Sequence, residues 1–143
     1  MSKETYNKII SKLQKLDEYI KYLKEMQNVN KNKFTEDYHF FGLAERYLQL
    51  SIEILLDIGK LLIIIKGLKR PEENQEIFSV LRDEKIVSEK LAENLMGIAN
   101  FRNILVHDYE KIDREIVYEK LQNNLSDIED FKKEIAGYIN KYI

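Results

Sequence analysis

Residues 41–66 read FGLAERYLQLSIEILLDIGKLLIIIK, and this stretch decides the fold class. Apolar residues recur on one side of it at helical spacing: Phe41, Ala44, Leu48, Leu55, Ile58, Leu62 and Ile65. We expect one helix over about residues 35–66, apolar around most of its circumference and therefore buried on most sides. Gly67 should lie just past its C-terminal end.

The remaining polar residues of this helix form one narrow stripe. Its members recur at intervals of 4, 4, 4 and 3: Glu45, Gln49, Glu53, Asp57 and Lys60. Arg46 lies at the margin of the stripe. On a mostly buried helix, such a stripe faces either solvent or a cleft.

Further helices are predicted on both sides of the central one. A stripe from Ile9 to Met26 predicts a first helix over about residues 4–28, followed by an Asn-rich connection over residues 28–33. Pro71 suits the first turn of a short third helix, and Ser88 and Asp113 suit the N-caps of a fourth and a fifth. Their apolar stripes contain Leu91, Leu95, Ile98, Phe101 or Arg102, and Leu105 in the fourth helix, and Val117, Leu121, Leu125, Ile128, Ile135 and Ile139 in the fifth. The sequence therefore predicts an all-α, up-and-down bundle of about five helices in a single domain, residues 1–143, with a long central second helix.

Composition narrows the function classes. The 143 residues include no Cys, which excludes disulfides, thiolate zinc sites and a cysteine nucleophile. No apolar run approaches the length of a membrane span, and the charged N-terminus makes a cytoplasmic location without membrane contact the expectation. No motif for a metal, a nucleoside triphosphate or a serine nucleophile occurs, so we expect no metal and no cofactor.

Charge is balanced overall but uneven along the chain. The net charge of −2 argues against a constitutive basic DNA coat, although it leaves room for a small local anion site. The first 33 residues hold eight Lys against four acidic residues. This segment is either a solvated basic face or a surface that contacts the backbone of RNA.

The segment that can carry chemistry is residues 101–109, FRNILVHDY. The chain has only two His and five Arg, so Arg102 and His107 are conspicuous in it. Asn103 and His107 stack on one helical face, whereas Arg102 and His107 lie about 140° apart. The two side chains can converge on one phosphate only if the helix ends near His107 or if a second subunit completes the pocket.

An Arg and a His without a metal suit RNA cleavage in which the ribose 2′-OH attacks the neighbouring phosphorus. His107 could exchange protons near neutral pH, and Arg102 could hold the charge on the phosphoryl oxygens. The other candidates for binding or orienting the substrate are Asn103, Asp108, Asp57 and Glu53. In a structural alternative, Arg102 pairs with a surface carboxylate, His107 caps the helix, and Tyr109 packs on the bundle.

The same segment resembles the RX4HXY signature of the HepT family, in the HEPN superfamily of helical bundles. Arg102, His107 and Tyr109 occupy its three fixed positions. Residues 44–59, AERYLQLSIEILLDIG, are similar to the long second helix of that family, and the charged fifth helix after HDY also fits. The chain departs from some relatives at Lys60, where they carry an acidic residue.

The resemblance implies a homodimer whose two RX4H segments line a shared cleft. It also implies a metal-independent endoribonuclease toxin that uses Arg102 and His107, and a minimal nucleotidyltransferase antitoxin as partner. That antitoxin would transfer AMP to Tyr109, and the added phosphate charge and bulk would block RNA beside Arg102 and His107.

Two alternatives remain open at this point. The chain could be a non-catalytic HEPN binding module that docks the nucleotidyltransferase and is modified by it, or a helical dimer without chemistry. If the shared cleft exists, Asp57 or Glu53 should lie near Arg102, because a charge on a mostly buried helix needs a partner. A fully solvated stripe would refute that placement.

Overall fold

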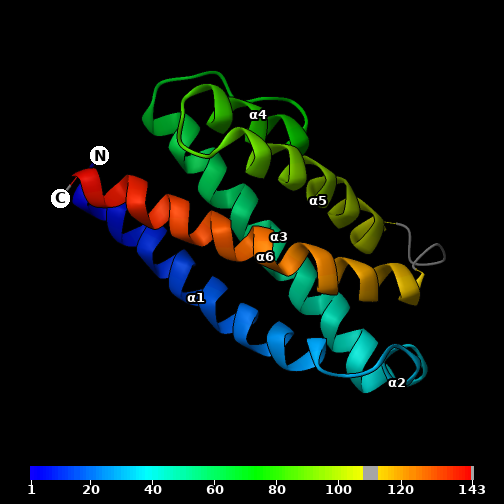
Figure 1. Ribbon diagram of the computed structural model, residues 1–143. Coiled ribbons are helices and arrows are strands. Elements are labelled where there is room, and N and C mark those ends of the chain that lie inside the picture. Colours follow the sequence, from blue (N-terminus) through cyan, green and yellow to red (C-terminus); the bar gives the residue numbers. More distant parts are fainter. Residues whose placement is uncertain (108–112, 143) are drawn as a thin grey trace.

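The computed structural model describes residues 1–107 and 113–142 and confirms the all-α prediction (Figure 1). The described residues contain no strand and form the following helices: α1 (Lys3–Gln27), α2 (Lys31–Glu36), α3 (Tyr38–Ile65), α4 (Asn74–Asp83), α5 (Glu89–His107), α6 (Arg114–Ile139) and the short 3₁₀-helix η2 (Asn140–Tyr142). No helix in this part of the chain is both long enough and apolar enough to span a bilayer.

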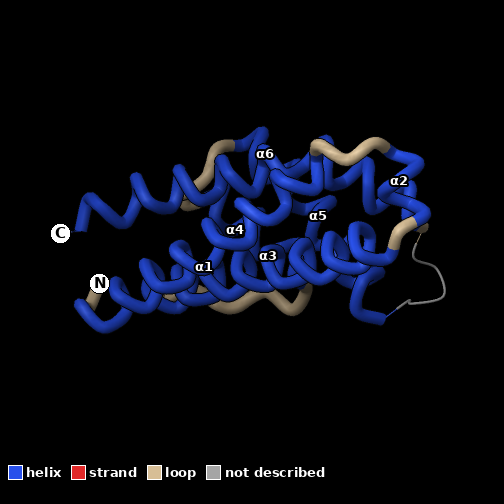
Figure 2. Tube along the Cα trace, turned by 90° about the horizontal axis from the view of Figure 1, so that it is seen from below, coloured by secondary structure: helices blue, strands red, loops and turns tan. Residues whose placement is uncertain are grey.

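Helix α3 is the centre of the bundle, as the sequence predicts. It packs against each of α1, α2, α4, α5 and α6. Helices α1 and α6 run antiparallel along one side of α3, and α4 and α5 pack together against its other side (Figure 1). Figure 2 shows that α1 begins and α6 ends at one end of the bundle, whereas α2 lies at the opposite end.

The predicted apolar stripes of the outer helices form the core. Every stripe residue of α1 and α6 is buried, as are Phe101 and the other apolar stripe residues of α5. In the stripe of the central helix, Phe41 is only partly buried, and the side chain of Ile65 is 37% exposed. Ile65 is the last residue of α3, and after it the chain leaves the bundle through the exposed turn at Gly67. The prediction that Ile65 is buried with the rest of its stripe is therefore wrong.

The N-terminal side of the central helix also differs from the prediction. Asp37 adopts an extended conformation and accepts a hydrogen bond from the His39 N–H at 2.9 Å, so it caps α3 and separates it from α2. Asn30 caps α2 in the same way, through the Lys33 N–H at 2.9 Å. The single helix expected from residue 35 is therefore two helices, and the connection expected over residues 28–33 is shorter.

The other predicted helix ends are mostly confirmed. Ser88 accepts the Leu91 N–H at 3.4 Å at the start of α5, and Asp113 accepts the Glu115 N–H at 2.9 Å at the start of α6. Gly67 follows α3 with a φ of 69°, a conformation that glycine adopts without a steric penalty. The third helix begins later than expected, at Asn74 instead of Pro71.

Close packing of α3 against α4 depends on Gly59. A Cβ atom at this position would lie 2.4 Å from Cγ2 of Ile77 in α4. The missing side chain lets α4 approach the central helix. This contact helps place the α4–α5 pair, and with it Arg102, over the polar stripe of α3.

Candidate functional site

Arg102 and Glu53 form the centre of the candidate site. Nη2 of Arg102, in α5, donates to Oε1 of Glu53, in α3, at 3.1 Å. Gln49, one turn earlier in α3, donates its side-chain N–H to the same oxygen at 3.2 Å. The predicted neighbourhood of Arg102 and the stripe carboxylate is thus confirmed for Glu53, and the stripe is not fully solvated.

Burial strengthens this ion pair. The side chains of Arg102 and Glu53 are 22% and 31% exposed, so both charges are partly removed from water. Nε of Arg102 is buried and has no hydrogen-bond partner among the described residues. The guanidinium is therefore held through Nη2, and Nη1, which forms no hydrogen bond with the described residues, keeps donor capacity for a further acceptor.

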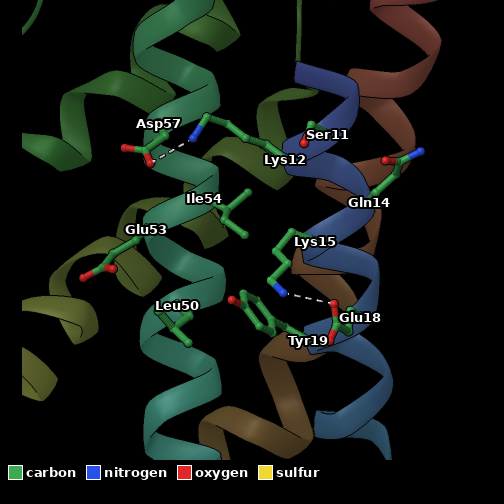
Figure 3. A pocket seen from close by; sticks show the side chains of 10 residues that line it. All are labelled: Ser11, Lys12, Gln14, Lys15, Glu18, Tyr19, Leu50, Glu53, Ile54 and Asp57. Carbon is green, nitrogen blue, oxygen red and sulfur yellow. Dashed lines mark hydrogen bonds and ion pairs between the residues drawn. The ribbon is translucent and has the colours of Figure 1, made fainter. Parts of the chain in front are cut away.

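Asp57 has a different partner from the one predicted for the stripe. Its Oδ2 accepts from Nζ of Lys12, in α1, at 3.4 Å, and its side chain is half exposed. Asp57 therefore faces α1, whereas Glu53, one turn away, reaches Arg102. Both residues line a groove of 570 Å³ between α1 and α3, and the carboxylate of Glu53 points away from α1 (Figure 3).

The remaining predicted site residues lie at and beyond the end of α5. Asn103 is exposed and follows Arg102 directly. His107 is the last residue of α5, and its side chain, like Asp108 and Tyr109, lies outside the described part of the chain. In a helix, five residues separate Arg102 from His107 by about 7.5 Å along the axis. The roles of His107, Asp108 and Tyr109 stay predictions.

Arg114, at the start of α6, is a cation near the N-terminal end of α3 that the sequence did not reveal. Its guanidinium lies 3.9 Å from the centre of the Phe41 ring and donates to the backbone oxygen of Thr35 at 3.1 Å. Partial burial raises the pKa of Glu45, in the α3 stripe, and the charge of Arg114 partly offsets this rise. The scarcity of Arg in the sequence was the only signal that could have drawn attention to Arg114.

The paired Arg102 and Glu53 side chains leave a guanidinium that can bind a phosphate group. A guanidinium that is paired with a carboxylate at one edge and has unused N–H groups can also donate to phosphate oxygens. No group of three or more His, Asp or Glu residues in the described ranges is arranged to hold a metal ion.

Comparison with known proteins assigns the chain to a family. The sequence model of the family described as "Ribonuclease HepT-like" matches residues 16–135, and the chain belongs to this family. A tRNA nuclease HepT from Aphanizomenon flos-aquae is 27% identical over 105 residues, which are 73% of this chain and 71% of the relative. An mRNA nuclease HepT from Shewanella oneidensis is also 27% identical over 105 residues, 73% of this chain and 78% of the relative.

The fold is similar to that of a solved toxin. The structure of a tri-AMPylated Shewanella oneidensis HEPN toxin in complex with MNT antitoxin superposes with a TM-score of 0.83 at 26% identity, covering 96% of this chain and 99% of that one. The family and the helical fold inferred from the RX4HXY resemblance are confirmed, and so is the ribonuclease class. These relatives support the function of a ribonuclease toxin in a toxin–antitoxin pair.

Proposed function

We propose that the chain cleaves RNA without a metal, with Arg102 and His107 acting on one phosphodiester. The observation that carries this proposal is the Arg102–Glu53 pair, which fixes a guanidinium on α5 within a ribonuclease family. In the reaction, the 2′-oxygen forms a bond to phosphorus as the bond from phosphorus to the 5′-oxygen breaks. His107 takes the 2′-OH proton or donates a proton to the departing 5′-oxygen, and Arg102 stabilises the charge on the phosphoryl oxygens.

The site is proposed to be shared in a homodimer. At 100° per residue, positions 102 and 107 of a helix are about 140° apart, so a second copy would bring an Arg and a His from different chains to one phosphate. Ile104, two residues after Arg102, supports this arrangement, because its apolar side chain is 39% exposed beside the site. Sedimentation velocity should show a dimer for the native chain and a monomer for Ile104→Glu.

Control by a nucleotidyltransferase antitoxin is part of the same proposal. The related Shewanella toxin is AMPylated and bound to an MNT antitoxin. Transfer of AMP to Tyr109 here would place a phosphate two residues after His107, where it would compete electrostatically with RNA for Arg102. Both partners are proposed to meet in the cytoplasm.

The test is cleavage of RNA by purified protein in EDTA. We expect products with 2′,3′-cyclic phosphate and 5′-hydroxyl ends, and we expect His107→Ala to abolish them without a change in thermal unfolding. Arg102→Gln should abolish them as well, but it also removes the ion pair with Glu53 and should lower the unfolding free energy by about 1 kcal/mol. Lys133→Gln, an exposed change on α6, is the control. Cleavage that persists in His107→Ala at the native rate would remove His107 from the mechanism.

A second candidate is a binding module that accepts AMP but cuts nothing. The acidic pI of 5.8 and the occupation of Arg102 by Glu53 favour it. Growth of cells that express the chain alone separates the two functions: the ribonuclease predicts arrest relieved by the antitoxin, whereas the binding module predicts normal growth.

A further inference from the structure

The groove of 570 Å³ between α1 and α3 is a surface feature to which the proposed chemistry assigns no role. Its floor contains Leu50 and Ile54 of α3, and its α1 wall contains Lys12, Lys15 and Tyr19 (Figure 3). A second hollow of 200 Å³ continues it along the same two helices, and Lys12 and Asp57 line both. We call these two hollows, which adjoin at the Lys12–Asp57 ion pair between α1 and α3, the trough.

Positive charge exceeds negative charge along this trough. Each of its carboxylates is already paired with a cation: Glu18 with Lys15 at 3.2 Å, Asp57 with Lys12 at 3.4 Å, and Glu53 with Arg102 at 3.1 Å. Lys8 and Lys60 line the second hollow and form no ion pair with any carboxylate of the described residues. Two uncompensated amines therefore remain on a chain whose net charge is −2.

An aromatic ring lies in the larger hollow, where Nζ of Lys15 is 5.5 Å from the centre of the Tyr19 ring. Tyr19 lines the groove, and its ring centre is 5.5 Å from that of Tyr47, which in turn lies 4.9 Å from Tyr22. All three side chains are partly exposed. Basic grooves with aromatic side chains are the usual solution for single-stranded nucleic acid, because phosphates pair with the amines and bases stack on the rings.

Glu53 links the trough to the candidate catalytic residues. It is one of the residues that line the groove, and its carboxylate, which points away from α1, pairs with Arg102 of α5 (Figure 3). From Lys8 to Tyr19, α1 rises about 16 Å, which matches about five stacked nucleotides of one strand.

We propose that this trough binds the single-stranded RNA next to the cut site. Backbone phosphates lie on Lys8, Lys12 and Lys60, and a base stacks on Tyr19. The proposal rests on the ribonuclease function proposed above and adds to it the path of the substrate. It assigns a role to the lysine excess of the first 33 residues, and it explains how an acidic protein can bind RNA, because the positive charge is concentrated in one place.

The test measures binding separately from cleavage. Fluorescence anisotropy would follow a labelled, fully 2′-O-methylated 12-nucleotide RNA, which lacks the attacking hydroxyl, on the dimer that carries His107→Ala. The variant is Lys8→Gln with Lys60→Gln. The control is Lys90→Gln with Lys133→Gln, which makes the same charge change at exposed positions of α5 and α6 outside the trough.

The expected result is a change in salt dependence as well as in affinity. For single-stranded RNA, each phosphate contact contributes about 0.7 to the steepness of the plot of log K against log salt concentration. The Lys8/Lys60 variant lacks two such contacts, so its slope should be shallower than the native slope by about 1.4. At 0.1 M salt this corresponds to binding weaker by roughly 25-fold. The Lys90/Lys133 control should keep the native slope. Equal slopes and affinities in the two double variants would overturn the proposal.

A second variant tests the stacking. Tyr19→Leu keeps an apolar side chain against Tyr47 but removes the ring that faces the groove, and it should weaken binding at least about fivefold at every salt concentration. Unchanged affinity would remove Tyr19 from the RNA path. If the Lys8/Lys60 variant loses affinity for the nucleotidyltransferase but not for RNA, the trough is a protein interface and the RNA assignment is wrong.

The outcome is independent of whether the chain cuts RNA. Cleavage of an unmodified RNA by the native chain reports on the proposed function. The salt dependence of binding reports on the trough alone. If the Lys8/Lys60 variant cleaves RNA with the rate and KM of the control, the proposed ribonuclease function stands and the proposed path of the RNA is wrong.

Discussion

Glu53→Gln should tighten the binding of RNA. The carboxylate oxygen of Glu53 accepts from both Arg102, at 3.1 Å, and Gln49, at 3.2 Å. A glutamine keeps an oxygen in place to accept from Arg102 but removes the negative charge. A phosphate bound to the other side of the guanidinium would lie about 6 Å from Glu53, two hydrogen-bond lengths away. The native carboxylate therefore repels the substrate that its own partner attracts.

The size of this repulsion follows from Coulomb's law. Two unit charges about 6 Å apart interact by about 0.7 kcal/mol in water and about 2.8 kcal/mol at an effective dielectric constant of 20. Because the side chains of Arg102 and Glu53 are 22% and 31% exposed, the lower part of this range applies. We expect a gain of about 1 kcal/mol, which is a Kd about fivefold lower. The folded state should lose at most about 1 kcal/mol of unfolding free energy.

The assay is again anisotropy with uncleavable RNA in the His107→Ala dimer. Glu129→Gln is the matched control, because Glu129 in α6 pairs with Lys24 at 3.0 Å and its side chain is similarly exposed, at 26%. Glu53→Gln should bind more tightly than this control. An affinity equal to or below that of the control would show that no phosphate shares Arg102 with Glu53, and the reasoning would be refuted.

Three further predictions concern the fold around the site. Gly59→Ala should lower the free energy of unfolding in urea by about 1–3 kcal/mol, because its Cβ would lie 2.4 Å from Cγ2 of Ile77. In an Ile77→Leu background, which lacks that methyl group, the loss should be smaller, and an equal loss would contradict the packing argument. Lys85→Gly should raise stability by about 1 kcal/mol, because Lys85 has a φ of 58°; an unchanged Tm would contradict it. Burial raises the pKa of Glu45, so the charged form of this side chain opposes folding. Glu45→Gln should therefore raise the free energy of unfolding at pH 7, and this gain should shrink as the pH falls to about 4. A gain that does not depend on pH would contradict this cause.

Helical periodicity was sufficient for most of the fold. The stripe of α1 and the caps at Ser88 and Asp113 are local features, and each is found where the pattern predicts it. The break at Asp37 was missed because its cap interrupts a pattern that continues on both sides with helix-forming residues. The exposure of Ile65 depends on where neighbouring helices end, which a one-dimensional period does not contain.

The candidate site was predictable only in part. The need of a partly buried carboxylate for a partner predicted that Asp57 or Glu53 lies near Arg102, and Glu53 does, 49 positions away in the chain. The same reasoning could not choose between Glu53 and Asp57, because the choice depends on how far α1 and α5 lie from α3. Lys12 forms an ion pair with Asp57, and no pattern in the sequence predicts this long-range contact.

The central claim is that the guanidinium of Arg102 and the imidazole of His107 act on the same phosphodiester. A crystal structure of the dimer with an RNA that carries a single 2′-deoxy nucleotide at the cut site tests it most directly. The account predicts that one phosphate accepts from Arg102 and lies within hydrogen-bond reach of His107 from the same or the second subunit. A scissile phosphate that contacts neither side chain, or only one of them, would contradict it.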